Sequence, residues 1–165
     1  MGAVVAALAD RDMESARVIV RRFMWQLNDE SGGIGWGCPE SMGEATARHQ
    51  GLAGEFAPVL ISYIREDGNF LEYEPLQPGA LWGVGRLAQA RPLLAQEARD
   101  PLLPFLASPE PVLRGLALWA LGPLGSRETM PHLEILLEDV TEIYIYVHQK
   151  LQTRMLEQLG HPLPS

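Results

Sequence analysis

The chain has 165 residues, of which 47% are hydrophobic and 21% charged, and its formal net charge is −8. This length and composition predict one globular domain, residues 1–165, with a continuous core. The acidic balance argues against nucleic acid as a partner, because binding to a phosphate backbone depends on clustered lysine and arginine. The single cysteine, Cys38, cannot form an internal disulfide, and no stretch approaches the roughly 20 apolar residues of a membrane span. We therefore expect a cytoplasmic protein that does not bind membranes.

The N-terminal part predicts two helices followed by a loop. Residues 2–9 are apolar but lack the positive flank of a signal peptide, so they predict a helix of about two turns. Asp12 then opens a second helical pattern, in which Ala16, Val20 and Phe23 share one face. Residues 28–37 contain four glycines and predict an irregular loop. A second irregular stretch, residues 66–76, is acidic and aromatic, and we expect its Phe70 and Leu71 to anchor it to the core.

The first loop allows two interpretations. Asp29, Glu30 and Trp36 give it the acidic and aromatic groups found in many recognition loops. Alternatively, Trp36 folds back over the core as a plug, and the glycines only permit the turn.

An apolar stripe repeats along the chain. Between Leu113 and Gly125 it contains Leu113, Ala117, Ala120, Leu121 and Leu124, all on one helical face. The same stripe begins 37 residues earlier (113 − 76) at Leu76 and aligns Trp82 with Trp119, and weaker copies begin at Ala16 and Cys38. Because one such helix cannot bury its apolar face alone, the repetition predicts stacked units in a solenoid. Short apolar stretches around Pro58, Pro104 and Pro131 predict partner helices, each with the proline near its start.

The C-terminal segment, from Thr141 to Gly160, has two possible structures. Its apolar residues at a spacing of four, including Ile143, Val147 and Leu151, predict one long helix that caps the stack. The alternation of isoleucine and tyrosine over residues 143–146 is also compatible with a strand. We expect the helix, because a lone strand in an all-α stack has no hydrogen-bond partner.

Two kinds of predicted helix alternate along the chain. One contains the pattern Pro-x-Leu, and the other reads apolar-Arg-x-x-Ala-x-x-Ala-Leu-x-x-Leu-Gly. This alternation resembles the HEAT repeat, particularly the bacterial HEAT-like type shared with phycobilin lyases. The resemblance is strong over 103–137, fair over 58–88 and weak before Gly51. It implies an all-α fold, an α-α superhelix (HEAT-like solenoid) of stacked antiparallel helix pairs, with roughly eight or nine helices. It implies no reaction.

In that family geometry the position of Trp119 faces the concave side. Counting back by the repeat offsets gives Trp82, Glu44 and Arg22 as its equivalents, and one turn further Arg86, Arg48 and Trp25. Tryptophan and arginine are typical of binding hot spots. The alternative is that the tryptophans fill space between repeats beside small residues such as Ala80 and Ala117. With the loop, the candidate binding residues are Arg22, Trp25, Asp29, Glu30, Trp36, Glu44, Arg48, Trp82, Arg86 and Trp119.

These features favour a non-enzymatic module that holds a peptide or protein segment in a concave groove, without a cofactor. The alternative is a small-molecule or tetrapyrrole-binding protein, in which Trp36, Trp82 and Trp119 wall a pocket and Arg86 meets a carboxylate. A base-flipping solenoid would need a basic groove, which the acidic charge disfavours. We expect no metal site, because the histidines show no paired His-Glu motif. Cys38 is a poor candidate nucleophile, since the nearest histidine, His49, lies eleven residues away (49 − 38) on the same predicted helix.

Overall fold

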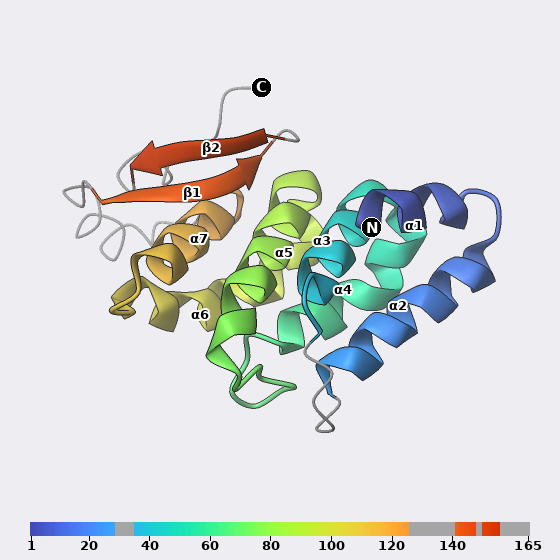
Figure 1. Ribbon diagram of the computed structural model, residues 1–165, viewed down its shortest axis with the longest axis horizontal. Coiled ribbons are helices and arrows are strands. Elements are labelled where there is room, and N and C mark those ends of the chain that lie inside the picture. The colour runs from blue at the N-terminus through green and yellow to red at the C-terminus, as the bar shows by residue number, and fades with distance from the viewer. Residues whose placement is uncertain (29–34, 126–140, 148–149, 156–165) are drawn as a thin grey trace.

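The computed structural model describes residues 1–28, 35–125, 141–147 and 150–155 (Figure 1). This part of the chain contains seven α-helices, four short 3₁₀ segments and two strands. The helices are α1 (Gly2–Ala9), α2 (Met13–Leu27), α3 (Cys38–Arg48), α4 (Gln50–Ser62), α5 (Gln77–Ala90), α6 (Arg99–Leu102) and α7 (Pro111–Leu121). The 3₁₀ segments are η1 (Glu74–Leu76), η2 (Pro92–Ala98), η3 (Leu103–Ala107) and η4 (Gly122–Leu124), and the strands are β1 (Glu142–Val147) and β2 (Lys150–Met155).

The helices form two layers. In one layer α1, α3, α5 and α7 follow one another, and each packs against the next (Figure 1). The other layer contains α2, α4 and the run of short turns from η2 to η3, which pack against the backs of the first. The chain thus folds as an α-α superhelix of stacked antiparallel helix pairs, which confirms the predicted fold class. No helix in the described ranges is both long and apolar enough to cross a membrane.

Polar caps and prolines set the helix boundaries. Asp12 begins α2, where its carboxylate accepts a hydrogen bond of 3.0 Å from the backbone N–H of Ser15. His49 separates α3 from α4, and its Nδ1 accepts from the backbone N–H of Leu52 at 3.2 Å. Pro58 lies inside α4 and not near its start, so that expectation is wrong, because the His49 cap starts the helix well upstream. Pro131 lies outside the described residues.

Glycines bring the helices of the first layer close together. A Cβ atom built on Gly43 of α3 would lie only 2.3 Å from Cα of Gly83 of α5. Between α5 and α7 the contact is different, because the ring of Trp119 packs directly on Gly85. Ala80 and Ala117 of the predicted stripe are fully buried. Trp119 is only 2% exposed, so it does fill space between neighbouring repeats.

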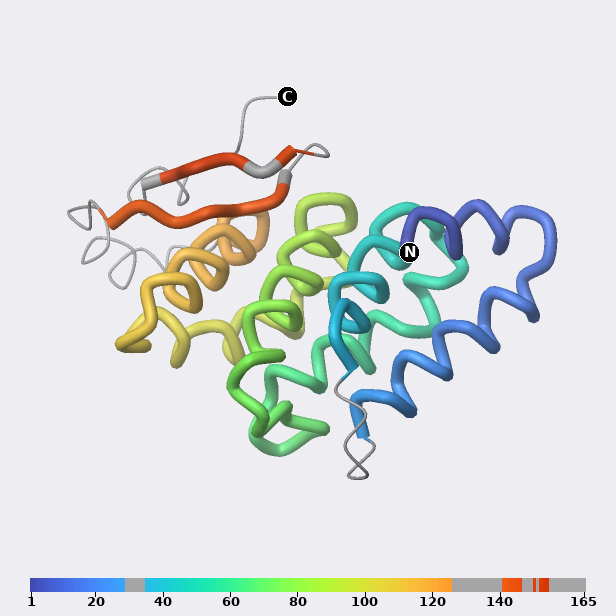
Figure 2. Tube along the Cα trace, viewed as in Figure 1, coloured from blue at the N-terminus to red at the C-terminus, as the bar shows by residue number. Residues whose placement is uncertain are grey.

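The C-terminal segment corrects the sequence-based prediction. Instead of one helix over 141–160, β1 and β2 form an antiparallel hairpin in which Glu142 pairs with Met155 and Val147 with Lys150 (Figure 2). Ile143 and Ile145 are buried, whereas Tyr144 is 71% and Tyr146 48% exposed. This period of two is that of a strand. The helix was predicted because a strand over 143–146 was expected to have no partner strand. That partner is β2, the next element along the chain.

The two predicted loops differ in how much is described. In the 66–76 loop Leu71 is buried, and its backbone N–H donates to the carbonyl of Tyr63 at 3.1 Å, so it anchors the loop as expected. Regular structure resumes there only at η1. Of the 28–37 loop only its ends are described. Gly37 closes it with a φ of 75°, in the left-handed region that favours glycine, immediately before α3.

Candidate functional site

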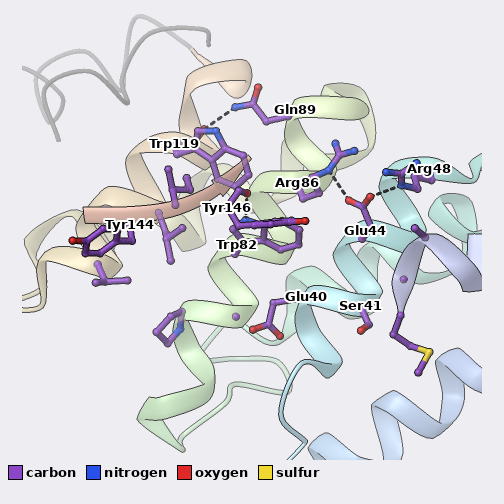
Figure 3. Close-up of a pocket in the computed structure, with 18 residues that line it drawn as sticks. Glu40, Ser41, Glu44, Arg48, Trp82, Arg86, Gln89, Trp119, Tyr144 and Tyr146 are labelled. Carbon is purple, nitrogen blue, oxygen red and sulfur yellow. Dashed lines mark hydrogen bonds and ion pairs between the residues drawn. The ribbon is translucent and has the colours of Figure 1, made fainter. Parts of the chain in front are cut away.

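An open groove of about 1090 Å³ runs across one face of α3, α5 and α7, beside the start of α1 and next to β1 (Figure 3). Helix α2 contributes nothing to its lining. The side chains that matter for its chemistry come from three helices and the hairpin, and they are Glu40, Glu44, Arg48, Trp82, Arg86, Trp119, Tyr144 and Tyr146.

One wall of the groove is aromatic. The rings of Trp82 and Trp119 are stacked, with centroids 6.3 Å apart and an angle of 28° between planes. The ring of Tyr146 lies 6.3 Å from Trp82 on another side. Nε1 of Trp82 donates a hydrogen bond of 2.8 Å to the backbone carbonyl of Tyr146. Since Trp119 is buried and Trp82 only partly so, Trp119 supports the wall and Trp82 with the tyrosines forms its accessible surface.

The hairpin presents an unpaired strand edge to this wall. Residues of an antiparallel strand alternate between those whose N–H and C=O face the partner strand and those whose groups point away from it. The carbonyl of Tyr146 accepts a hydrogen bond from Trp82 and so points away from β2. Tyr144, two residues earlier on β1, has the same direction. In the part of the chain that the structure describes, β1 has no second strand beside it.

Charged side chains join α3 to α5 on the opposite side. Glu44 accepts a hydrogen bond of 2.7 Å from Nε of Arg86, and its other oxygen is bonded to Arg48 (Figure 3). All three side chains are partly exposed. One carboxylate thus orients both arginines through their Nε–H groups, and the terminal N–H groups of each guanidinium remain available for other contacts.

A second carboxylate of α3 is less well compensated. Glu40 lies one turn before Glu44 and points into the groove (Figure 3). Its Oε2 is buried and has no hydrogen-bond partner among the described residues. A Cβ atom on Gly79 of α5 would lie 2.7 Å from its carboxyl carbon, so a larger residue there would make the carboxylate move from this position. Burial raises the pKa of Glu40.

The structure brings together five of the ten predicted site residues, namely Glu44, Arg48, Trp82, Arg86 and Trp119. Arg22 and Trp25 were placed wrongly. They lie exposed on α2, outside the groove, because the repeat copy that begins at Ala16 is a helix of the other layer and α1 occupies the expected inner position.

The loop residues do not join the groove. Trp36 is 62% exposed and packs edge-on against Tyr73, with ring centroids 6.3 Å apart. It neither lines the groove nor covers the core as a plug. Asp29 and Glu30 lie outside the described residues.

The predicted binding residues did not include Glu40, Tyr144 and Tyr146. Glu40 could have been found, because a residue four positions before Glu44 shares its helix face. The tyrosines were missed because the segment was interpreted as a helix.

The structure offers little for nucleophilic or metal chemistry. The thiol of Cys38 donates to Oε1 of Gln26 at 3.1 Å, and burial raises its pKa, which disfavours the thiolate. Cys38 and His49 stand at opposite ends of α3. Among the described residues, no group of three or more His, Cys, Asp and Glu side chains could hold a metal ion.

The comparisons with known proteins agree with this architecture. Residues 74–124, from η1 to η4, match the family model of the HEAT-like repeat. The matched segment contains α5 and α7, the helices that carry Trp82 and Trp119. No curated protein and no solved structure gave a significant match to the chain. The HEAT-like repeat over residues 74–124 agrees with the stacked helix pairs of an all-α, solenoid-like fold, and repeats of this type commonly mediate protein–protein interaction.

Proposed function

We propose that this protein is a non-enzymatic binding module that holds an extended segment of a protein partner in the groove. The observation that carries this proposal is the edge of β1 beside the wall formed by Trp82 and Tyr146, which no further strand covers among the described residues and on which Trp82 already holds the carbonyl of Tyr146. An extended peptide can add to such an edge as a further strand, with main-chain hydrogen bonds for affinity and side-chain pockets for specificity. An exposed strand edge is otherwise a liability that proteins cover or blunt.

The size and lining of the groove support a peptide. Its volume of about 1090 Å³ is at the upper end of the roughly 300–1,000 Å³ of small-molecule pockets, and it is an open groove with room for a peptide segment. Tyrosine and tryptophan are enriched at protein interfaces because they bury a large apolar area and still offer a polar group. The small-molecule or tetrapyrrole alternative is less well supported, because Trp36, one of the three tryptophans expected to wall its pocket, does not line the groove.

The strand edge can be tested with one backbone change. Proline at position 144 removes the N–H that points into the groove and leaves the bonds to β2 in place. The matched control is Tyr144→Val, which removes the ring but keeps the N–H. Both variants would be titrated against immobilised decapeptides of alternating β-branched and polar residues, after circular dichroism has shown that they fold.

We expect Tyr144→Pro to bind at least about tenfold more weakly than Tyr144→Val, as the loss of backbone hydrogen bonds at a partly buried edge requires. Equal binding by the two variants would contradict addition of a strand to β1.

A further inference from the structure

We infer that Glu40 receives a lysine or arginine side chain of the bound peptide, so that the groove selects extended segments with a basic residue. This inference rests on the proposed function and specifies the chemistry of the partner.

The contact between α3 and α5 indicates that a cation would stabilise the Glu40 carboxylate. Glu40 and Glu44 are one turn apart on the same face of α3. Glu44 meets Arg86 of α5, so its charge is balanced within the chain. Two turns earlier on α5 the residue that faces Glu40 is Gly79, which has no side chain to offer. An equivalent cation at Glu40 must therefore come from outside.

The surroundings of Glu40 compensate its charge only in part. Its place in the first turn of α3 and its own backbone N–H favour the carboxylate, whereas desolvation disfavours the ionised form. Its Oε2 has no hydrogen-bond partner in the described chain. The two arginines that line the groove, Arg48 and Arg86, each donate from Nε to Glu44, and no ion pair of Glu40 is found among the described residues. A partly buried carboxylate gains from a hydrogen-bonded cation, which a partner can bring.

The neighbouring aromatic ring suits a long basic side chain. Trp82 lies three residues after Gly79 on α5, so it shares the face that meets Glu40. Its ring lines the groove. The methylene stem of lysine or arginine packs well on such a surface while its charged end reaches the carboxylate. The two residues together therefore select both the length and the charge of the guest side chain.

The test compares two matched sets of decapeptides with capped ends. One set carries a single lysine among β-branched and polar residues, and the other carries norleucine at the same position. Affinities are measured for the natural chain, for Glu40→Gln and for Glu72→Gln, an exposed carboxylate that does not line the groove. Melting curves establish that both variants are folded.

We expect the natural chain and Glu72→Gln to prefer lysine by about tenfold or more, the effect of a partly buried charge-assisted hydrogen bond. In Glu40→Gln the two sets should bind within about twofold of each other. If lysine and norleucine peptides bind equally well to the natural chain, or if the preference survives in Glu40→Gln, the inference is wrong while the peptide-binding function stands. If neither set binds the natural chain, both proposals fail.

Discussion

Gly85 of α5 lies flat against the indole ring of Trp119 of α7, so close that a Cβ atom at position 85 would stand 2.5 Å from two of its carbons. Real Cβ atoms do not approach aromatic carbons to that distance, so one of the two helices would have to move. This contact sets the spacing between the last two helices of the first layer. Trp82, which lies on the same helix as Gly85 and is stacked with Trp119, depends on the same spacing.

We predict that Gly85→Ala destabilises the fold by about 1–3 kcal/mol, the usual effect of overpacking a core. Gly54→Ala is the matched control, because Gly54 also lies inside a helix but has nothing within 4 Å of a built Cβ. There the substitution should stabilise by about 0.5–1 kcal/mol, since alanine is the better helix former. Urea unfolding of both variants measures the difference. Equal effects at the two positions would show that Trp119 adapts freely.

Glu40→Gln should stabilise the unliganded protein at neutral pH. A glutamate has an ordinary pKa of about 4.3, and burial raises the pKa of Glu40 in the folded state. The folded state therefore binds this proton more tightly than the unfolded state, and stability falls as the pH rises from about 4.3 through the folded pKa. Thermal midpoints should favour the glutamine variant at pH 7 and converge below pH 4. A midpoint lowered at pH 7 would mean that the carboxylate is compensated after all.

Asp12 should show the opposite dependence on pH. The hydroxyl and the backbone N–H of Ser15 both donate to its carboxylate and lower its pKa below the ordinary value of about 3.9. Its contribution to stability is present above about pH 4 and is lost as the pH falls through the lower folded pKa. The stability difference between the natural chain and Asp12→Ala should thus be constant from pH 5 to 7 and shrink in stronger acid. A difference that grows in acid would contradict this assignment of the cap.

Trp36→Ala should have a small effect on stability. The ring is mostly exposed and its aromatic partner is Tyr73, a contact worth about 0.5–1.5 kcal/mol.

Trp119→Ala should lower the free energy of unfolding by about 3–5 kcal/mol, because that ring is buried. The effects of Trp36→Ala and Trp82→Ala on stability should add, since the two rings share no contact. Strong coupling between them in a double-mutant cycle would place Trp36 closer to the groove than it lies here.

The repeat pattern predicted the helical layers because their apolar stripe is a local property of each helix. The offsets from Leu113 to Leu76 and Cys38 correctly found α7, α5 and α3. The copy at Ala16 misled because α2 is amphipathic in the same way but belongs to the other layer. Periodicity shows that a helix has a buried face, and it does not show which layer the helix occupies.

Five of the eight residues of the candidate site could be predicted for the same reason. Residues on consecutive inner helices follow from repeat arithmetic, as Glu44, Trp82 and Trp119 did. Tyr144 and Tyr146 could not, because their position depends on the pairing of two adjacent strands, which is a non-local choice between helix and hairpin. The same holds for Glu40. Its Oε2 has no hydrogen-bond partner among the described residues and its carboxylate faces Gly79 of the neighbouring helix α5, and the sequence alone does not show that these two residues meet.

The hydrogen bond from Trp82 to the hairpin ends on the main-chain carbonyl of position 146 and not on the tyrosine side chain. Any amino acid provides that carbonyl, so the side chains at positions 144 and 146 can be exchanged without detaching the hairpin from α5. The main chain of the hairpin therefore attaches it to α5, while the side chains at positions 144 and 146 remain available to contact a bound peptide. A library randomised at these two positions would be expected to keep its fold while changing its choice of guest, which makes this hairpin a natural starting point for engineered binders.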